Sequence, residues 1–351
     1  MRASLVTYGI LHFLVDAVGA ATVFAILGRT GVGLDAPLLL VYGLISFASR
    51  PVLGLVVDAN FSARSAAVFG SALVAMGSTL LSRTPFAAVI TLGIGNALFH
   101  VGAGSICFRL KPGLAGPSGV FAAPGALGVF VGTVLGARAL TQPWIIAMAL
   151  VVTAGMSLTL AEPSQEQATF TADRSVSDGP IALLLLSIAS ISLAGFVFRF
   201  PWQATPSLAA VVVMAVVVGR ALGGLLADRF GWRRIALGGL LFSIPFLAGG
   251  MANVVSGVLG LALLNLALPV ASTAVFTTLR THPAFAFGLV SLALIAGGLP
   301  ALVGIMSPLT QSSVRVLLLP VACGALYVGF KKVASLNNAV VISRPSIPGL
   351  L

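Results

Sequence analysis

The stretch Arg220-Ala-Leu-Gly-Gly-Leu-Leu-Ala-Asp228 repeats the arginine, glycine and aspartate spacing of an earlier stretch, Arg50-Pro-Val-Leu-Gly-Leu-Val-Val-Asp58. The two stretches lie 170 positions apart (220 minus 50), and each stands at the end of an apolar run. An internal repeat of this kind predicts that the chain consists of two similar halves, so every other segment has to be interpreted within that division.

The composition predicts a membrane protein. Of the 351 residues, 58% are hydrophobic and 8% are charged, and the mean hydropathy is +1.12. Soluble domains carry roughly 25% charged residues. Apolar runs of about 20 residues, the length that crosses a hydrocarbon core of ~30 Å as a helix, recur along the chain. We predict twelve transmembrane helices, at 5–27, 37–57, 65–81, 86–108, 118–140, 143–161, 181–199, 206–227, 234–252, 254–278, 284–307 and 313–330.

The expected fold is therefore an all-α polytopic membrane protein with two pseudo-symmetric six-helix bundles, at 1–161 and 181–330. The segment 162–180 between them is polar and carries four of the eight acidic residues, which is typical of a linker. Residues 331–351 contain no long apolar run, so we expect a cytoplasmic tail that is ordered at first and then frays on the membrane surface.

The net charge of +11 does not indicate a nucleic-acid partner, because the basic residues are scattered singly through short loops. Membrane orientation explains them better. With the N-terminus inside, the inner side receives 12 lysines and arginines and the outer side 5, which leaves Arg50 and Arg220 within helices. This distribution follows the positive-inside rule and predicts that both termini and the linker are cytoplasmic.

Two six-helix halves, with a glycine-rich Asp/Arg loop after the second helix of each, resemble the major facilitator superfamily of transporters over nearly the whole chain. The superfamily's loop signature, roughly G-x-L-A-D-R-x-G-R-R, is almost complete in Gly224-Leu-Leu-Ala-Asp228-Arg229-Phe-Gly-Trp-Arg233-Arg234, and the first half keeps Gly54, Asp58 and Arg64. The resemblance implies alternating access by rocking of the two halves, a small-molecule substrate bound near the midplane, and action as a monomer.

The resemblance also implies that Asp58 and Asp228 are gating residues rather than substrate ligands. Gly54 and Gly224 would permit close approach of helices, and an aspartate at a helix end can accept hydrogen bonds from the N-terminus of a neighbouring helix or from basic side chains. Simple helix capping is the alternative. The other expected members of the gate are Arg64, Arg229, Arg233, Arg234, Arg50 and Arg220.

Arg50 and Arg220 are expected to pair with the loop aspartates Asp58 and Asp228. Two alternatives remain open, because an arginine within a helix can also snorkel or present a positive wall to an anion.

Within the superfamily, two stretches look like the fosmidomycin-resistance group of drug exporters. They are His12-Phe-Leu-Val-Asp16 in the first helix and Gly93-Ile-Gly-Asn96-Ala-Leu-Phe-His100 in the fourth. This resemblance implies efflux across a bacterial cytoplasmic (inner) membrane by antiport. Many proton-coupled members carry an arginine early in the fourth helix, whereas this chain has Thr-Leu-Gly-Ile-Gly at 91–95. Proton coupling then depends on other residues.

Asp16 is the only acidic residue inside a predicted helix, which makes it a functional candidate because a charge within the bilayer is costly. His12 lies one turn away on the same helix face, and His100 falls at a similar depth on the fourth helix. Imidazole titrates near neutral pH, so this cluster can accept and release a proton. A purely structural hydrogen-bond set is one alternative, and a site for divalent iron or zinc is another.

The remaining candidates are Asn96 and Asn265, which stand 169 positions apart and are expected to be equivalent in the two halves. The few charges and many apolar side chains favour a small, partly hydrophobic or anionic organic substrate. We predict a proton-coupled secondary transporter that exports such a compound. Export of a divalent metal through His12, Asp16 and His100 and a non-transporting receptor are the alternatives. The chain contains no HExxH motif or nucleophile elbow, so we expect neither an enzyme nor a cofactor.

Overall fold

The computed structural model describes residues 2–30, 35–82, 84–138, 143–160, 178–303 and 312–342. Within these ranges the chain is helical and contains no strand. The first half contributes α1 (Arg2–Thr30), α2 (Asp35–Gly43), η1 (Leu44–Ala48), α3 (Arg50–Asn60), α4 (Ala63–Thr79), η2 (Leu80–Ser82), α5 (Pro85–Leu110), α6 (Gly116–Ala137) and α7 (Pro143–Ser157). The second half contributes α8 (Asp178–Val197), η3 (Pro201–Ala204), α9 (Pro206–Phe230), α10 (Trp232–Gly249), α11 (Val254–Asn265), α12 (Ala267–Thr278), α13 (Pro283–Leu302) and α14 (Ser312–Ile342).

Each of the twelve predicted apolar runs overlaps a helix or a pair of helices. Among the residues that the structure describes, eight helices are long and apolar enough to cross a membrane. The third, sixth, ninth and twelfth runs form α4, α7, α10 and α14, which are not in that set of eight. The number of twelve spans therefore stays a prediction.

Two of the predicted spans are interrupted, and a proline accounts for each break. In the second run the π-helical turn η1 separates α2 from α3, whose first turn contains Pro51. In the tenth run α11 and α12 meet at Leu266, three residues before Pro269. Proline removes an N–H donor and clashes with the carbonyl four residues earlier, so the helix opens on its N-terminal side. The breaks fall next to Arg50 and Asn265, whose roles are described below.

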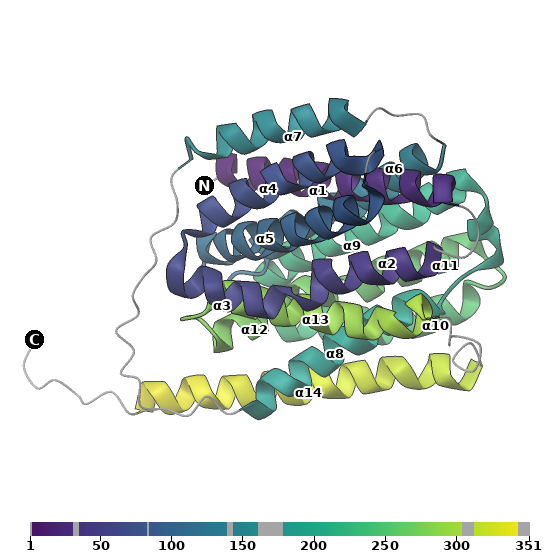
Figure 1. The fold of residues 1–351 in the computed structure, drawn as a ribbon. Helices are drawn as coiled ribbons and strands as arrows, with labels where there is room; N and C mark the ends of the chain where they lie inside the picture. Colours follow the sequence, from purple (N-terminus) through teal and green to yellow (C-terminus); the bar gives the residue numbers. More distant parts are fainter. Residues whose placement is uncertain are drawn as a thin grey trace, which may run out of the picture.

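The buried side chains form two main cores. The larger core consists mostly of residues from 184 to 330, and the second consists of residues from 8 to 154. Phe287 of α13 packs against both. In Figure 1 the start of α1 and the end of α14 lie at the same end of the bundle. The boundaries 1–161 and 181–330 stay predictions, since residues 161–177 lie outside the described ranges.

The halves meet along two helix pairs, α3 with α13 and α6 with α9. Glycines stand at both crossings. A Cβ atom added at Gly54 would lie 2.5 Å from the Ala284 carbonyl oxygen, and one added at Gly224 would collide with the Ala115 backbone. Because small residues let helix backbones approach closely, these two glycines set the spacing between the halves.

The first part of the expected tail after residue 330 continues the last helix. Helix α14 continues through Lys331 and Lys332 to Ile342. The segment 331–342 contains mostly residues that a helix tolerates, and the next proline, which would end a helix, is Pro345. Residues 343–351 lie outside the described ranges.

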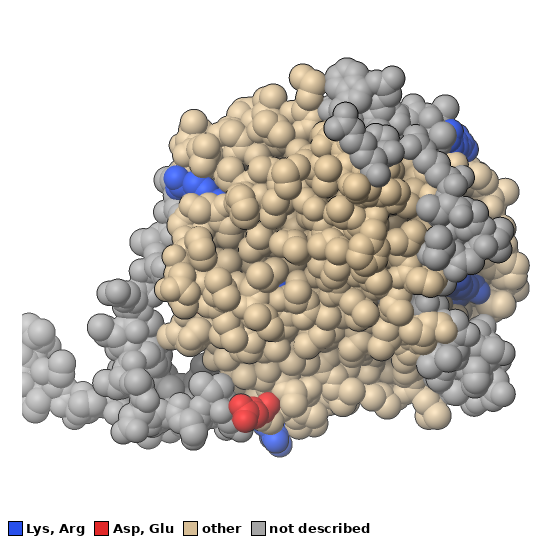
Figure 2. All heavy atoms as spheres, viewed as in Figure 1, with Lys and Arg blue, Asp and Glu red and all other residues tan. Residues whose placement is uncertain are grey.

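The surface has the character of a membrane protein. On the face shown in Figure 2, most of the charged side chains lie at the periphery, and only a small basic spot is visible near the centre. Large apolar side chains are exposed, including Val52 (65%), Phe69 (59%) and Phe242 (67%). An exposed apolar surface of this extent requires an apolar partner, and a lipid bilayer provides one.

Candidate functional site

Three ionisable side chains from α1 and α5 meet inside the first half. The Nε2 atom of His12 lies 3.2 Å from one carboxylate oxygen of Asp16, and the Nε2 atom of His100 lies 3.7 Å from the other. The two Nε2 atoms are 3.0 Å apart. The side chains are 8%, 13% and 5% exposed for His12, Asp16 and His100, so water screens their interactions weakly. The structure thus brings the predicted cluster together.

The second ring nitrogen of each histidine faces a backbone carbonyl oxygen. The Nδ1 atom of His12 lies 2.7 Å from the Phe121 oxygen, and the Nδ1 atom of His100 lies 2.8 Å from the Asn96 oxygen. A carbonyl oxygen can only accept, so each Nδ1 carries a hydrogen. Gly125 of α6 lies against the His12 ring with no room for a Cβ atom, which lets α6 supply this carbonyl. Both Nε2 atoms are therefore directed at Asp16 and at each other.

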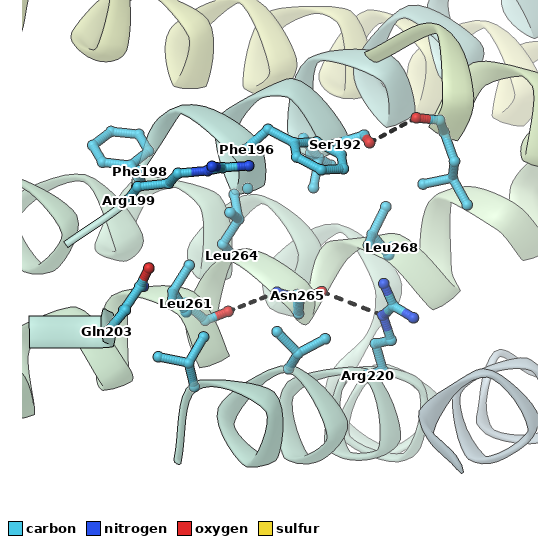
Figure 3. Close-up of a pocket in the computed structure, with 15 residues that line it drawn as sticks. Ser192, Phe196, Phe198, Arg199, Gln203, Arg220, Leu261, Leu264, Asn265 and Leu268 are labelled. Atoms are coloured by element: carbon cyan, nitrogen blue, oxygen red, sulfur yellow. Dashed lines mark hydrogen bonds between the residues drawn. The ribbon is translucent and has the colours of Figure 1, made fainter. Parts of the chain in front are cut away.

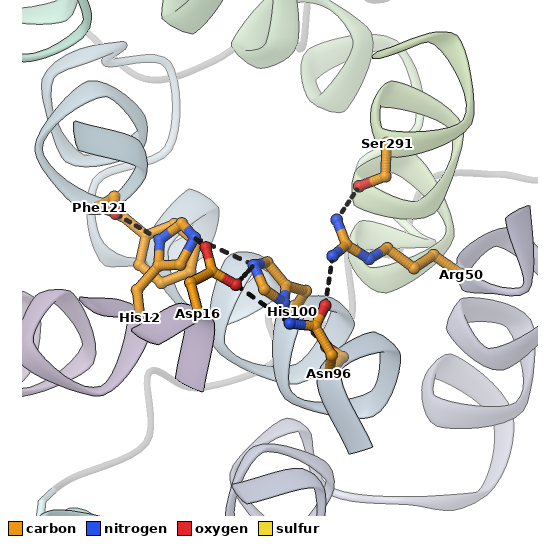
Figure 4. A network of polar contacts seen from close by, with 7 residues as sticks. All are labelled: His12, Asp16, Arg50, Asn96, His100, Phe121 and Ser291. Carbon is orange, nitrogen blue, oxygen red and sulfur yellow. Dashed lines mark hydrogen bonds and ion pairs between the residues drawn. The ribbon is translucent and has the colours of Figure 1, made fainter. Parts of the chain in front are cut away.

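A chain of hydrogen bonds extends this cluster to the opposite half (Figure 4). The Asn96 amide nitrogen donates to an Asp16 oxygen at 3.0 Å, and its amide oxygen accepts from Arg50 Nη2 at 2.8 Å. Arg50 Nη1 then donates to the hydroxyl of Ser291 on α13 at 2.9 Å. Asp16 of the first half is thereby connected to α13 of the second half.

Aromatic rings enclose the cluster on one side. The His12 ring stacks on Phe121 with ring centroids 4.5 Å apart, and the His100 ring lies 6.3 Å from that of Phe287. Phe287 also contacts Phe121 and Phe108, at 6.1 and 5.8 Å. Phe287 and Ser291 come from the opposite half, and sequence reasoning did not identify them. The only signal in the sequence is that they stand four positions apart, on the same face of one helix.

The second half contains a counterpart of the arginine and asparagine pair. Arg220 Nε donates to the Asn265 amide oxygen at 3.4 Å, as Arg50 donates to Asn96. The expected equivalence of Asn96 and Asn265 is visible in this pairing. Only Asn96 joins the Asp16 cluster, whereas Asn265 lies in the other half.

The expected pairing of the helix arginines with the loop aspartates is wrong for Arg50. Its terminal nitrogens bind Asn96 and Ser291, and its Nε has no partner within the described residues. The physical reason is distance, because Asp58 lies eight residues further along the helix, about 12 Å at 1.5 Å per residue. Arg220 likewise bonds to Asn265 and lines a cavity rather than turning toward the loop.

This cavity has a volume of about 300 Å³ and lies between helices of the second half. Figure 3 shows Arg220 and Asn265 on one side and Arg199 with Gln203 toward another. Much of the wall is apolar, with Phe196, Leu261, Leu264 and Leu268 among its residues. None of the described residues that line it is acidic. The cavity can hold a small molecule with an apolar body.

The two loop aspartates bind helix N-termini of the opposite half. The Asp58 oxygens accept from the backbone N–H groups of Ala284 and Phe285 at 3.0 and 2.9 Å, at the start of α13. The Asp228 oxygens accept from those of Ala115 and Gly116 at 2.7 and 2.8 Å, at the start of α6. Carboxylates are favoured at helix N-termini by the free N–H groups and by the helix dipole. The two contacts are related by the internal repeat.

The loop arginines have other surroundings. Arg229 lies over the Phe230 ring at 5.2 Å and Arg233 over the Tyr327 ring at 5.0 Å, while Arg234 is exposed. In the first half Arg64 donates to the Leu158 carbonyl oxygen at 3.3 Å. These side chains are peripheral to the two aspartate contacts.

No protein-family model and no curated protein sequence matches the chain. Several solved structures share its fold. FucP, a major facilitator superfamily transporter in the outward conformation, gives a TM-score of 0.71 at 14% identity and covers 94% of this chain and 98% of its own. A variant of the E. coli fucose:proton symporter FucP gives 0.71 at 12% identity, with coverage of 95% and 98%.

A bacterial homologue of the iron transporter ferroportin, in an outward-facing state, gives a TM-score of 0.59 at 18% identity, with coverage of 95% and 99%. Identities this low establish a shared fold and leave the substrate open. The chain is an integral membrane protein with the fold of the major facilitator superfamily transporters.

Proposed function

We propose that this protein is a proton-coupled secondary transporter that exports a small, partly hydrophobic or anionic organic compound by alternating access. The observation that carries the proposal is the cluster of His12, Asp16 and His100. Its ring nitrogens and carboxylate oxygens converge in a buried place. The lone pairs of the Nε2 atoms and of the carboxylate repel one another there unless a cation is bound between them. A proton is the smallest cation that satisfies them.

The hydrogen-bond partners define where that proton resides. Since both Nδ1 atoms already donate to carbonyl oxygens, two neutral imidazoles would point the lone pairs of their Nε2 atoms at each other across 3.0 Å. One added proton between the two Nε2 atoms turns this repulsion into a hydrogen bond, and its charge balances the Asp16 carboxylate. The cluster is thus a site that binds one proton and can release it when its surroundings change.

Alternating access is supported by the repeated aspartate contacts. Asp58 and Asp228 each bind the N-terminus of a helix from the other half, so breaking both pairs would allow 1–161 to rock against 181–330. We place this end, where the chain also begins, in the cytoplasm of a bacterial inner membrane on the basis of the positive-inside distribution. On this assignment, the contacts of Asp58 and Asp228 would close the cytoplasmic end.

Two further arguments bear on coupling and direction. The similar structure FucP is named a fucose:proton symporter, so proton coupling occurs on this fold. Export, action as a monomer and kinship with the fosmidomycin-resistance exporters are proposed from the resemblance of the first and fourth helices. Because the fourth helix lacks the arginine that many proton-coupled members carry, we assign the coupling role to the Asp16 cluster.

The test is pH-gradient-driven efflux from proteoliposomes with a panel of small organic compounds. We expect Asp16→Asn to lose the dependence on the gradient, because the amide carries no charge to balance the added proton. Asp178→Asn is the matched control, since Asp178 is an exposed acid in the first turn of α8. Coupled transport that is equally strong in Asp16→Asn and wild type would remove Asp16 from this role. A protein that shows no turnover with any compound would favour the receptor alternative.

One observation favours a second candidate, export of a divalent metal ion as substrate. The ligand atoms of His12, Asp16 and His100 all lie within 4.8 Å of one another. Ligand atoms that each lie about 2.0–2.2 Å from one tetrahedral ion are about 3.3–3.6 Å apart. The shortest distances between the three side chains are 3.0, 3.2 and 3.7 Å. Titration of the purified protein with Fe²⁺, Co²⁺ or Zn²⁺ decides the matter. Binding that is lost in His12→Ala would support metal transport, and no binding of any of these ions would end it.

A further inference from the structure

The two copies of the internal repeat differ at one position that faces the helix arginine. The repeat aligns α13 with α6, because Ala284 and Phe285 stand to Asp58 as Ala115 and Gly116 stand to Asp228. The offset in these helices is 169 positions (284 minus 115). Gly288 and Gly119 obey the same offset, and a Cβ atom at each would meet the backbone oxygen of Arg50 or Arg220, respectively. The backbones of α13 and α6 therefore pass the two arginines in the same register.

The equivalent of Ser291 under this offset is Ala122 (291 minus 169). Ser291 accepts a hydrogen bond from a terminal nitrogen of Arg50, whereas alanine offers no such acceptor. Asn265 engages Arg220 only through Nε, at 3.4 Å. Within the part of the chain that the structure describes, no hydrogen bond involves the two terminal nitrogens of Arg220. The outer edge of this guanidinium is left with two parallel N–H donors.

Arg220 is one of the residues that line the 300 Å³ cavity. Asn265 is itself held in place, because its amide nitrogen donates to the Leu261 carbonyl oxygen at 2.9 Å. It therefore acts as a positioning residue that orients Arg220. Arg199, at another part of the wall, is exposed and adds a second positive charge that can attract anions toward the cavity.

We propose that this cavity binds an organic monocarboxylate with an apolar body, through a bidentate contact with the terminal nitrogens of Arg220. The planar fork of arginine matches a carboxylate, and a single guanidinium edge balances one negative charge. The leucine and phenylalanine side chains of the wall contact the apolar body, and the volume limits it to a small molecule. This assignment rests on the proposed transport function, since it names the class of substrate.

The assignment is tested by equilibrium binding to the purified full-length protein in lipid nanodiscs, measured by isothermal titration calorimetry. Three probes of similar shape separate the charges: benzoate, its uncharged amide benzamide, and the more highly charged phenylphosphonate. We expect benzoate to bind best. A hydrogen bond to a charged group contributes enough that Arg220→Gln should lower the affinity for benzoate about 10- to 100-fold.

The sharper variant is Ala122→Ser, which restores the missing element of the repeat. Its hydroxyl should accept a hydrogen bond from Arg220, as the Ser291 hydroxyl accepts one from Arg50. The affinity for benzoate should then fall by roughly 3- to 10-fold although the charge of Arg220 is retained. Ala149→Ser is the matched control, and should leave benzoate affinity unchanged because Ala149 is exposed on α7 in the other half. A melting temperature close to that of wild type shows that each variant is folded.

The proposal is overturned if benzamide or phenylphosphonate binds as well as benzoate, or if Arg220→Gln and Ala122→Ser both keep wild-type affinity. The transport function fails separately. Benzoate binding that depends on Arg220, with no flux driven by a pH gradient, would keep the carboxylate site and refute coupled transport. Gradient-driven efflux of an uncharged compound, with no benzoate binding, would keep the transporter and refute the site.

Discussion

Replacing Asp228 by asparagine should weaken the closure of the end at which the aspartates lie. The Asp228 carboxylate accepts two backbone hydrogen bonds across the interface between the halves, at 2.7 and 2.8 Å, from Ala115 and Gly116. Asparagine keeps one acceptor oxygen and points an NH₂ donor at the other N–H group. The change is nearly isosteric, so packing around Gly224 stays as it is.

The magnitude follows from these contacts. One charge-assisted hydrogen bond is lost and the other becomes neutral, and hydrogen bonds to charged groups contribute about 1.5–3 kcal/mol each. The favourable interaction of a negative charge with the N-terminus of α6 also disappears, about 0.3–1 kcal/mol. A total near 2–3 kcal/mol would shift the equilibrium between the closed and open forms of this end by roughly 30- to 150-fold.

The assay measures the distance between spin labels at positions 111 and 230 by pulsed electron paramagnetic resonance. Lys111 and Phe230 are exposed and belong to opposite halves. Both natural cysteines, Cys107 and Cys323, are first replaced by serine. We expect one short distance in the wild type and a longer second population in Asp228→Asn, with unchanged binding of substrate. Asp178→Asn serves again as the control. An unaltered distance distribution in Asp228→Asn would refute the idea that this carboxylate holds the halves together.

Three other predictions concern the contacts of α13 with the first half and the Asp16 cluster. Gly54→Val should open the α3–α13 contact, because its Cβ would lie 2.5 Å from the Ala284 oxygen; labels across that contact would show it, and an unchanged distance would contradict it. Phe287→Ala should destabilise the protein by about 3–5 kcal/mol if its site does not collapse, visible as a lowered melting temperature. Asn96→Ala should weaken gradient-driven efflux without abolishing it, since Asp16 loses one donor but keeps both histidines; wild-type coupling would refute this.

Much of the site was accessible from the sequence because its signals are local. His12 and Asp16 stand one helical turn apart, so the helix itself brings them together. His100 could be placed near them because its position within the fourth apolar run gives its depth in the membrane. The role of the glycines and aspartates in the repeated stretch was expected from the resemblance to the superfamily, together with the ability of an aspartate at a helix end to accept hydrogen bonds from a neighbouring helix.

The partners from the other half were not accessible. Arg50 looked like a partner of Asp58 because both lie on one helix, but it binds Ser291, which is 241 positions away. Phe287 gives no signal in the sequence that separates it from the chain's other phenylalanines. Such contacts depend on how the two bundles pack against each other, and no pattern within one bundle encodes the register of the other.

The sequence by itself determined that the chain lies in a membrane, because apolar content and helix periodicity are properties of each segment alone. It also determined that the chain is repeated, since the repeat is written in the residues. Only the tertiary structure decided how the two copies differ. The exchange of Ser291 for Ala122 has no meaning until α13 and α6 are placed against the two arginines. One arginine is then satisfied by the opposite half, and the other faces a cavity, because a hydrogen bond requires its partner within about 3 Å in space, whatever the separation along the chain.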